Sequence, residues 1–162
     1  MTIFNSVKFA ALLSSVCVLC SIPAAAAEHM TKNAYQIDRA FSPAVVTEGG
    51  KTIWLAGSSA LKDASGKDIA WDFDAQLKRV WDQIDEVLQR QGGTLKDIVT
   101  ITVFITDARL GDKVVESRRQ IWKDGNYPGS ALITVANLAK PGLLVEIQAI
   151  AVVGDKRPEA AR

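Results

Sequence analysis

Hydrophobic residues recur through the middle of the chain with two periods, and each period predicts a different element. Residues 71–93 carry apolar side chains at the three- and four-residue spacing of one helical face. Aspartates open this segment, where a helix favours negative charge, and a glycine pair ends it. The apolar positions are Phe73, Leu77, Val80, Trp81, Ile84, Val87 and Leu88. A helix is therefore predicted over 71–93.

Residues 97–107 instead alternate strictly between two sides, which predicts a strand. One side carries Val99, Ile101, Val103 and Ile105, and the other carries Thr100, Thr102, Phe104 and Thr106. Further strands are predicted at 35–38, 44–49, 51–57, 130–138 and 143–153. A tight glycine turn at 49–50 separates the second and third of these, and a loop is predicted at 58–70. A second helix is predicted at 111–125, and mobile ends at 28–33 and 154–162. This order predicts an α+β domain with a single mixed β-sheet and two helices packed on one face.

The second faces of the late strands are not fully apolar, yet they carry little charge. Ser130, Leu132 and Thr134 share one such face, and Leu144, Glu146, Gln148 and Ile150 share another. An exposed sheet face normally carries several charges, and two helices can cover only one side of a sheet. We therefore expect these faces, together with the threonine side of 97–107, to be covered by another copy of the chain, with Glu146 near the interface.

The first 27 residues have the pattern of a cleaved secretory signal. Lys8 precedes a short apolar run, and small residues follow up to an A-x-A ending at Ala27. A membrane anchor is the alternative, but the run is short for a span and Pro23 interrupts it. We expect cleavage after Ala27, a periplasmic or secreted mature domain of residues 28–162, and no stable membrane insertion.

Removal of this segment would narrow the available chemistry. Cys17 and Cys20 would leave with it, and the one histidine, His29, would lie at the new N-terminus, where we expect a solvated tail. This argues against a Ser-His-Asp triad, a cysteine nucleophile and zinc sites of histidine and cysteine, so no metal or cofactor is expected. Loss of Lys8 leaves 18 basic against 18 acidic residues. A net charge of zero is a poor basis for holding phosphates, so we expect no nucleic-acid partner.

Glu146 is the remaining candidate for chemistry. It lies between Val145 and Ile147 in the most apolar part of the chain, where a carboxylate costs free energy unless it is paired or hydrogen-bonded. One interpretation is structural: Glu146 caps a loop amide or pairs with Arg118 or Arg119. The other is functional: its carboxylate holds a water molecule for attack on a bound electrophile.

Several segments, taken in order, resemble the Rid family, which is also called YjgF-like or L-PSP endoribonuclease. They are FSPAVV (41–46), IWLAG (53–57), the long helix around Gln76, DIVTITVFITD (97–107), YPGSALITVANL (127–138) and LLVEIQAIAVV (143–153). The resemblance implies a chorismate-mutase-like subunit and a homotrimer with clefts between subunits. From the family's archetype it also implies hydrolysis of reactive enamines and imines, such as those from 2-aminoacrylate, without cofactor or metal.

The resemblance also assigns roles to individual residues. Glu146 matches a glutamate that helps to position the attacking water, whereas Ser130 replaces an arginine that binds the substrate carboxylate. Phe41 replaces a tyrosine of the cleft, and Ala56, beside the strand-ending glycine, replaces a serine. The expected substrate-binding residues are Ser130, Phe41, Ala56, Gly57 and Thr134. Because an arginine binds a carboxylate through two parallel hydrogen bonds, its loss predicts weak activity on amino-acid imines.

Three functions remain open at this point. The first is a Rid-type hydrolase acting on a small electrophile that lacks a carboxylate. The second is a non-catalytic protein that binds a ligand in the same cleft, with a structural Glu146. The third is the ribonuclease or chaperone-like role attached to some relatives, and the balanced charge argues against the ribonuclease.

Overall fold

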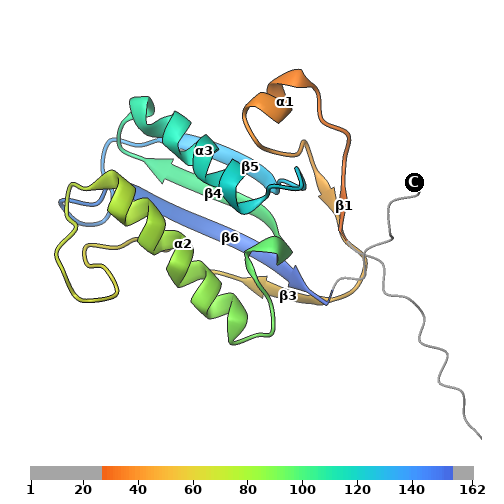
Figure 1. Ribbon diagram of the computed structural model, residues 1–162, viewed down its shortest axis with the longest axis horizontal. Coiled ribbons are helices and arrows are strands. Elements are labelled where there is room, and N and C mark those ends of the chain that lie inside the picture. The colour runs from red at the N-terminus through yellow and green to blue at the C-terminus, as the bar shows by residue number, and fades with distance from the viewer. Residues whose placement is uncertain (1–26, 155–162) are drawn as a thin grey trace, which may run out of the picture.

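The computed structural model describes residues 27–154, which form a four-stranded sheet in the order β3–β6–β4–β5 (Figure 1). The strands are β3 (Lys51–Trp54), β4 (Ile98–Ile105), β5 (Gly129–Thr134) and β6 (Val145–Val153). β3 and β4 run antiparallel to β6, whereas β5 runs parallel to β4. The sheet is therefore mixed, as the sequence predicts.

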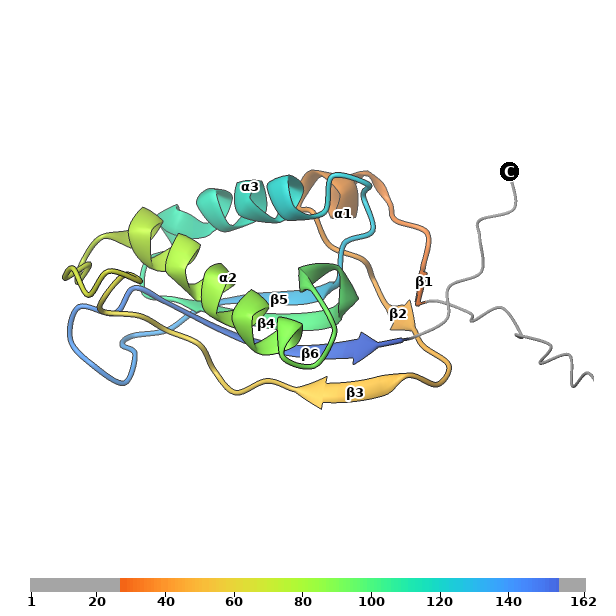
Figure 2. The same ribbon diagram turned by 60° about the horizontal axis from the view of Figure 1, so that its bottom comes forward.

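Two long helices, α2 (Phe73–Gln89) and α3 (Gly111–Ile121), lie on one face of this sheet (Figure 2). α2 begins after Asp72, whose side chain accepts a hydrogen bond from the backbone of Ala75. Its predicted apolar stripe is buried except for Val87, which is 41% exposed. No helix of residues 27–154 covers the opposite face (Figure 2). The prediction of an α+β fold with two helices on one face is confirmed.

The hydrophobic core fills the space between the helices and the sheet, where apolar positions of β4 and β6 meet α2. The rings of Trp81 and Trp122 pack edge to face there, with centroids 5.7 Å apart. β4 contains an irregularity between Ile98 and Thr100 that shifts its pairing with β6. A bulge of this kind changes which side chains face inward. Ile98 is therefore 1% exposed, although strict alternation would place it beside Thr100 on the other face.

The prediction of a strand at 35–38 is wrong, because these residues lie in the helix α1 (Ala34–Asp38). Asn33 and Gln36 form a reciprocal capping box at its start: each side chain accepts a hydrogen bond from the other residue's backbone. Two backbone N–H groups are satisfied in this way, which favours a helical turn over an extended strand.

A separate two-stranded sheet lies beside the main one. β1 (Glu28–His29) pairs with β2 (Val45–Val46), so the predicted glycine turn joins two sheets and forms no hairpin between β2 and β3. His29 is not in a solvated tail, because its Nδ1 lies 2.8 Å from the carbonyl oxygen of Tyr127. Ser42 Oγ donates to the same oxygen at 2.5 Å. These contacts fix the start of the domain beside the turn that precedes β5.

The predicted signal sequence up to residue 26, with both cysteines, and the predicted tail from residue 155 onward lie outside the described residues. Within residues 27–154, no helix is both long and apolar enough to cross a membrane.

Candidate active site

Glu146 lies in β6, with its side chain on the sheet face that the helices leave open. It is half-buried and pairs in register with Phe104 of β4. The chain beyond β3 continues alongside β6, because Ser58 and Ile147 exchange backbone hydrogen bonds of 2.8 and 3.0 Å. This pairing brings Gly57 against the carboxylate: a Cβ added at Gly57 would come within 2.1 Å of Glu146 Oε1. The missing side chain at position 57 therefore leaves the space that the carboxylate occupies.

The Glu146 carboxylate has no hydrogen bond or ion pair within residues 27–154. Arg118 donates to Ser130, and Arg119 pairs with Asp38 and Glu116, so neither arginine partners Glu146. The structure thus excludes the pairing that the sequence left open. A carboxylate of this kind keeps its lone pairs available to accept hydrogen bonds from water or from a ligand.

Ser130, Leu132 and Thr134 lie on the opposite side of the sheet from Glu146. β5 runs parallel to β4 with Ser130 in register with Ile101, a buried core residue. Cα partners in register direct their side chains to the same face. The expectation that Ser130 shares an uncovered face with the threonines of β4 is therefore wrong, because Ser130 faces α3.

Ser130 lines a cavity of about 300 Å³ at β5, the edge strand of the sheet. The other lining residues are Tyr35, Arg39, Phe41, Arg118 and Leu132. Phe41 packs edge to face on Tyr35, with ring centroids 6.0 Å apart. Thr134 lies four residues further along β5, about 13 Å away at the usual rise of a strand, and is exposed outside this cavity.

Arg118 is a buried residue of this cavity that the sequence did not single out for ligand binding. It lies in the last turn of α3 and is 2% exposed. Its Nη1 donates to Ser130 Oγ at 2.9 Å and lies 3.5 Å from the carbonyl oxygen of Ala40. Burial lowers the pKa of Arg118 to about 10, and nearby Arg39 adds to this effect. A guanidinium that is charged at neutral pH therefore stands beside the serine hydroxyl.

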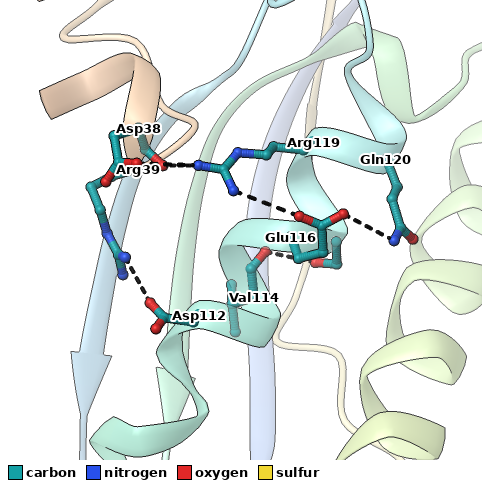
Figure 3. A network of polar contacts seen from close by, with 8 residues as sticks. Asp38, Arg39, Asp112, Val114, Glu116, Arg119 and Gln120 are labelled. Carbon is teal, nitrogen blue, oxygen red and sulfur yellow. Dashed lines mark hydrogen bonds and ion pairs between the residues drawn. The ribbon is translucent and has the colours of Figure 1, made fainter. Parts of the chain in front are cut away.

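Ion pairs between α1 and α3 hold the outer wall of the cavity in place (Figure 3). Arg39 Nη1 lies 2.7 Å from Asp112 Oδ1, and Arg119 lies 3.5 Å from Asp38 Oδ1 while also donating to the Asp38 carbonyl oxygen. Figure 3 shows both arginines bridging the two helices. Solvent-exposed pairs of this kind contribute about 0.2–1 kcal/mol each, so their main effect here is to position α1.

A larger cavity of about 490 Å³ between α2 and α3 contains none of the predicted site residues. Charged side chains on its lining pair with each other, Lys113 with Asp74 at 2.5 Å and Lys78 with Asp82 at 2.7 Å. Within residues 27–154, no group of three or more histidine, cysteine, aspartate or glutamate side chains is placed to hold a metal ion.

The predicted site residues thus fall into two groups, with Thr134 in neither of them. Glu146 lies with Gly57 and the adjacent, exposed Ala56, whereas Ser130 lies with Phe41. Strand spacing and register place the Cα atoms of Glu146 and Ser130 about 14 Å apart, with side chains on opposite faces. One chain alone does not bring all of these residues into a single site.

Comparison with known proteins establishes the family. The profile described as Endoribonuclease L-PSP matches residues 31–153. The chain belongs to this family. Among Endoribonuclease L-PSP relatives, human 2-iminobutanoate/2-iminopropanoate deaminase is 29% identical over 114 residues, covering 70% of this chain and 80% of its own length. Protein DfrA of Myxococcus xanthus is 35% identical over 114 residues, which cover 69% of this chain and 84% of DfrA.

Solved structures of the same family share the fold. YyfB of Yersinia pestis, described as a Rid family protein of unknown function, superposes with a TM-score of 0.65 at 26% identity, covering 73% of this chain and 90% of that one. The YjgF gene product of E. coli superposes with a TM-score of 0.54 at 28% identity, and the match covers 67% of this chain and 84% of that one. The resemblance to the Rid family inferred from the sequence is confirmed.

Proposed function

We propose that this protein hydrolyses a reactive enamine or imine in a cleft between the subunits of a homotrimer. The observation that carries the proposal is Glu146, a half-buried carboxylate without an internal partner on the open face of the sheet. Such a carboxylate can orient a water molecule and accept its proton as the oxygen attacks the C=N carbon. Transfer of that proton from Glu146 to the nitrogen then lets the C–N bond break, which releases ammonia and a carbonyl compound. The human relative is a 2-iminobutanoate/2-iminopropanoate deaminase, which supports this reaction class.

The open sheet face supports assembly with further copies of the chain. Trp54 is 76% exposed and Ile133 is 41% exposed on this face, and Phe104 and Ile150 lie between them. Large apolar side chains gathered on one exposed face are typical of a protein interface. A second copy could also place its Ser130 cavity next to Glu146, which one chain alone does not do.

A trimer is therefore the expected state in solution. Light scattering coupled to size exclusion should give about three subunit masses for the purified protein. A monodisperse monomer at micromolar concentration would contradict both the assembly and the cleft between subunits.

The reaction is tested with a panel of imines made in situ from amino acids and from amines without a carboxylate. We expect the protein to accelerate ammonia release from at least one of them tenfold or more over the spontaneous rate, or about 1.4 kcal/mol of barrier lowering. The blank is the same panel with heat-denatured protein. If no imine reacts faster while a ligand still binds, the protein is instead a non-catalytic binding trimer, in line with the loss of an arginine at Ser130.

A further inference from the structure

Arg118 is a buried cation without an acidic partner among residues 27–154. Its contacts are with neutral oxygens, Ser130 Oγ and the Ala40 carbonyl. Neither Nε nor Nη2 has a hydrogen-bond acceptor in the same residues. A buried charge is costly unless an opposite charge accompanies it. A buried guanidinium that lies beside a cavity and has no acidic partner is a candidate for ligand binding.

The other arginines around the cavity already have acidic partners. Arg39 is paired with Asp112, and Arg119, outside the lining, is paired with Asp38 and Glu116. Arg118 is therefore the charged residue of the lining that has no carboxylate partner within residues 27–154. A ligand with a single negative charge would balance it.

The groups beside Arg118 favour a small organic acid. A guanidinium is planar and donates two parallel hydrogen bonds, which match the two oxygens of a carboxylate. Ser130 Oγ accepts its hydrogen bond from Arg118, so its own proton remains available for a ligand oxygen. The rings of Tyr35 and Phe41 supply an apolar lining. The cavity volume of about 300 Å³ is at the small end of the range for ligand pockets, which suits a small molecule.

We propose that this cavity binds a monocarboxylate through the guanidinium of Arg118, assisted by the Ser130 hydroxyl and by Arg39. The Rid resemblance leads one to expect an arginine at position 130 of β5, where this chain has a serine. Arg118 of α3 instead supplies a guanidinium beside that serine. The link to substrate choice rests on the proposed function. As the carboxylate site of that hydrolase, this cavity would select imines that carry a carboxylate. The expectation of weak activity on amino-acid imines is thereby reversed.

Binding is tested by titrating the purified protein with propanoate and with propanamide, its uncharged analogue of the same size. We expect propanoate to bind at least tenfold more tightly by calorimetry. Arg118→Gln should remove this preference, because glutamine supplies neither the charge nor the fork. Arg109→Gln is the matched control: this exposed arginine pairs with Asp107 away from the cavity, and its loss should leave propanoate binding unchanged.

If Arg118→Gln does not fold, the wild-type protein still decides the question. The side-chain Nε signal of Arg118 in a ¹⁵N NMR spectrum should shift with propanoate and not with propanamide. Equal binding of the two compounds, or a signal that neither compound moves, would overturn the proposal.

Glu146→Gln separates this inference from the proposed hydrolysis. That variant should keep the preference for propanoate over propanamide, because it leaves the guanidinium of Arg118 in place and removes a negative charge from the proposed cleft. Imine turnover without selective carboxylate binding would overturn only the role of Arg118. Selective binding without turnover of any imine would overturn only the hydrolase.

Discussion

Glu146→Gln is expected to lower imine turnover by about 10²–10⁴-fold, the usual contribution of a general base. Glutamine has nearly the same shape as glutamate but cannot take a proton from the attacking water. The free energy of unfolding should change by less than about 1 kcal/mol, because the carboxylate has no partner within residues 27–154 to leave unpaired. Steady-state ammonia release and thermal unfolding measure the two effects separately.

Two further variants make this experiment specific. Gln148→Ala is the matched control, since Gln148 lies two residues along β6 on the same face and is exposed. It should retain turnover. Gly57→Ala should lose turnover with Glu146 intact, because the new Cβ would displace the carboxylate oxygen that lies 2.1 Å from its position. A fully active Glu146→Gln protein would show that Glu146 is not the catalytic base.

Gln76→Leu is expected to reduce the free energy of unfolding by about 2–4 kcal/mol. Gln76 is fully buried, and its Nε2 donates to the carbonyl oxygens of Ile69 and Gly142 at 2.9 and 2.7 Å. Its Oε1 accepts from the backbone N–H of Leu144 at 2.8 Å. Leucine fills a similar volume but removes all three hydrogen bonds. The backbone N–H of Leu144 would be left without an acceptor, which costs about 1–3 kcal/mol. The carbonyl oxygens of Ile69 and Gly142 would lose one bond each, about 0.5–1.5 kcal/mol, and would keep the backbone N–H groups of Asp72 and Trp71 as donors.

Denaturant unfolding measures this loss, with Gln89→Leu as the control from the exposed side of the same helix. The control should remain within about 0.5 kcal/mol of wild type. A loss below about 1 kcal/mol for Gln76→Leu would mean that water or a rearranged loop replaces these hydrogen bonds. Because Leu144 directly precedes β6, the contacts of Gln76 also fix the strand that carries Glu146.

The central elements of the fold could be predicted because their side chains repeat over many residues. α2 and β4 have long apolar patterns, and β6 is an apolar strand interrupted at Glu146 and Gln148. α1 is only five residues long, too short for a period to develop. Its one local signal is the spacing of Asn33 and Gln36, which forms a capping box.

The site depends more heavily on contacts between distant parts of the chain. Glu146 could be recognised from its sequence neighbours alone. The face on which Ser130 lies follows from the parallel register of β5 on β4, which no local pattern encodes. Arg118 occurs among Val114, Val115 and Trp122 on the apolar side of α3, and a charge in that position is the signal that could have identified it.

The division of the site between two faces of one sheet has a genetic consequence. In the proposed trimer, each cleft would take its glutamate from one subunit and its arginine from a neighbour. A cell that expresses two defective alleles, one lacking Glu146 and the other lacking Arg118, would assemble mixed trimers. Some of their clefts would combine the intact glutamate of one product with the intact arginine of the other. The two alleles would complement each other, although neither supports activity alone.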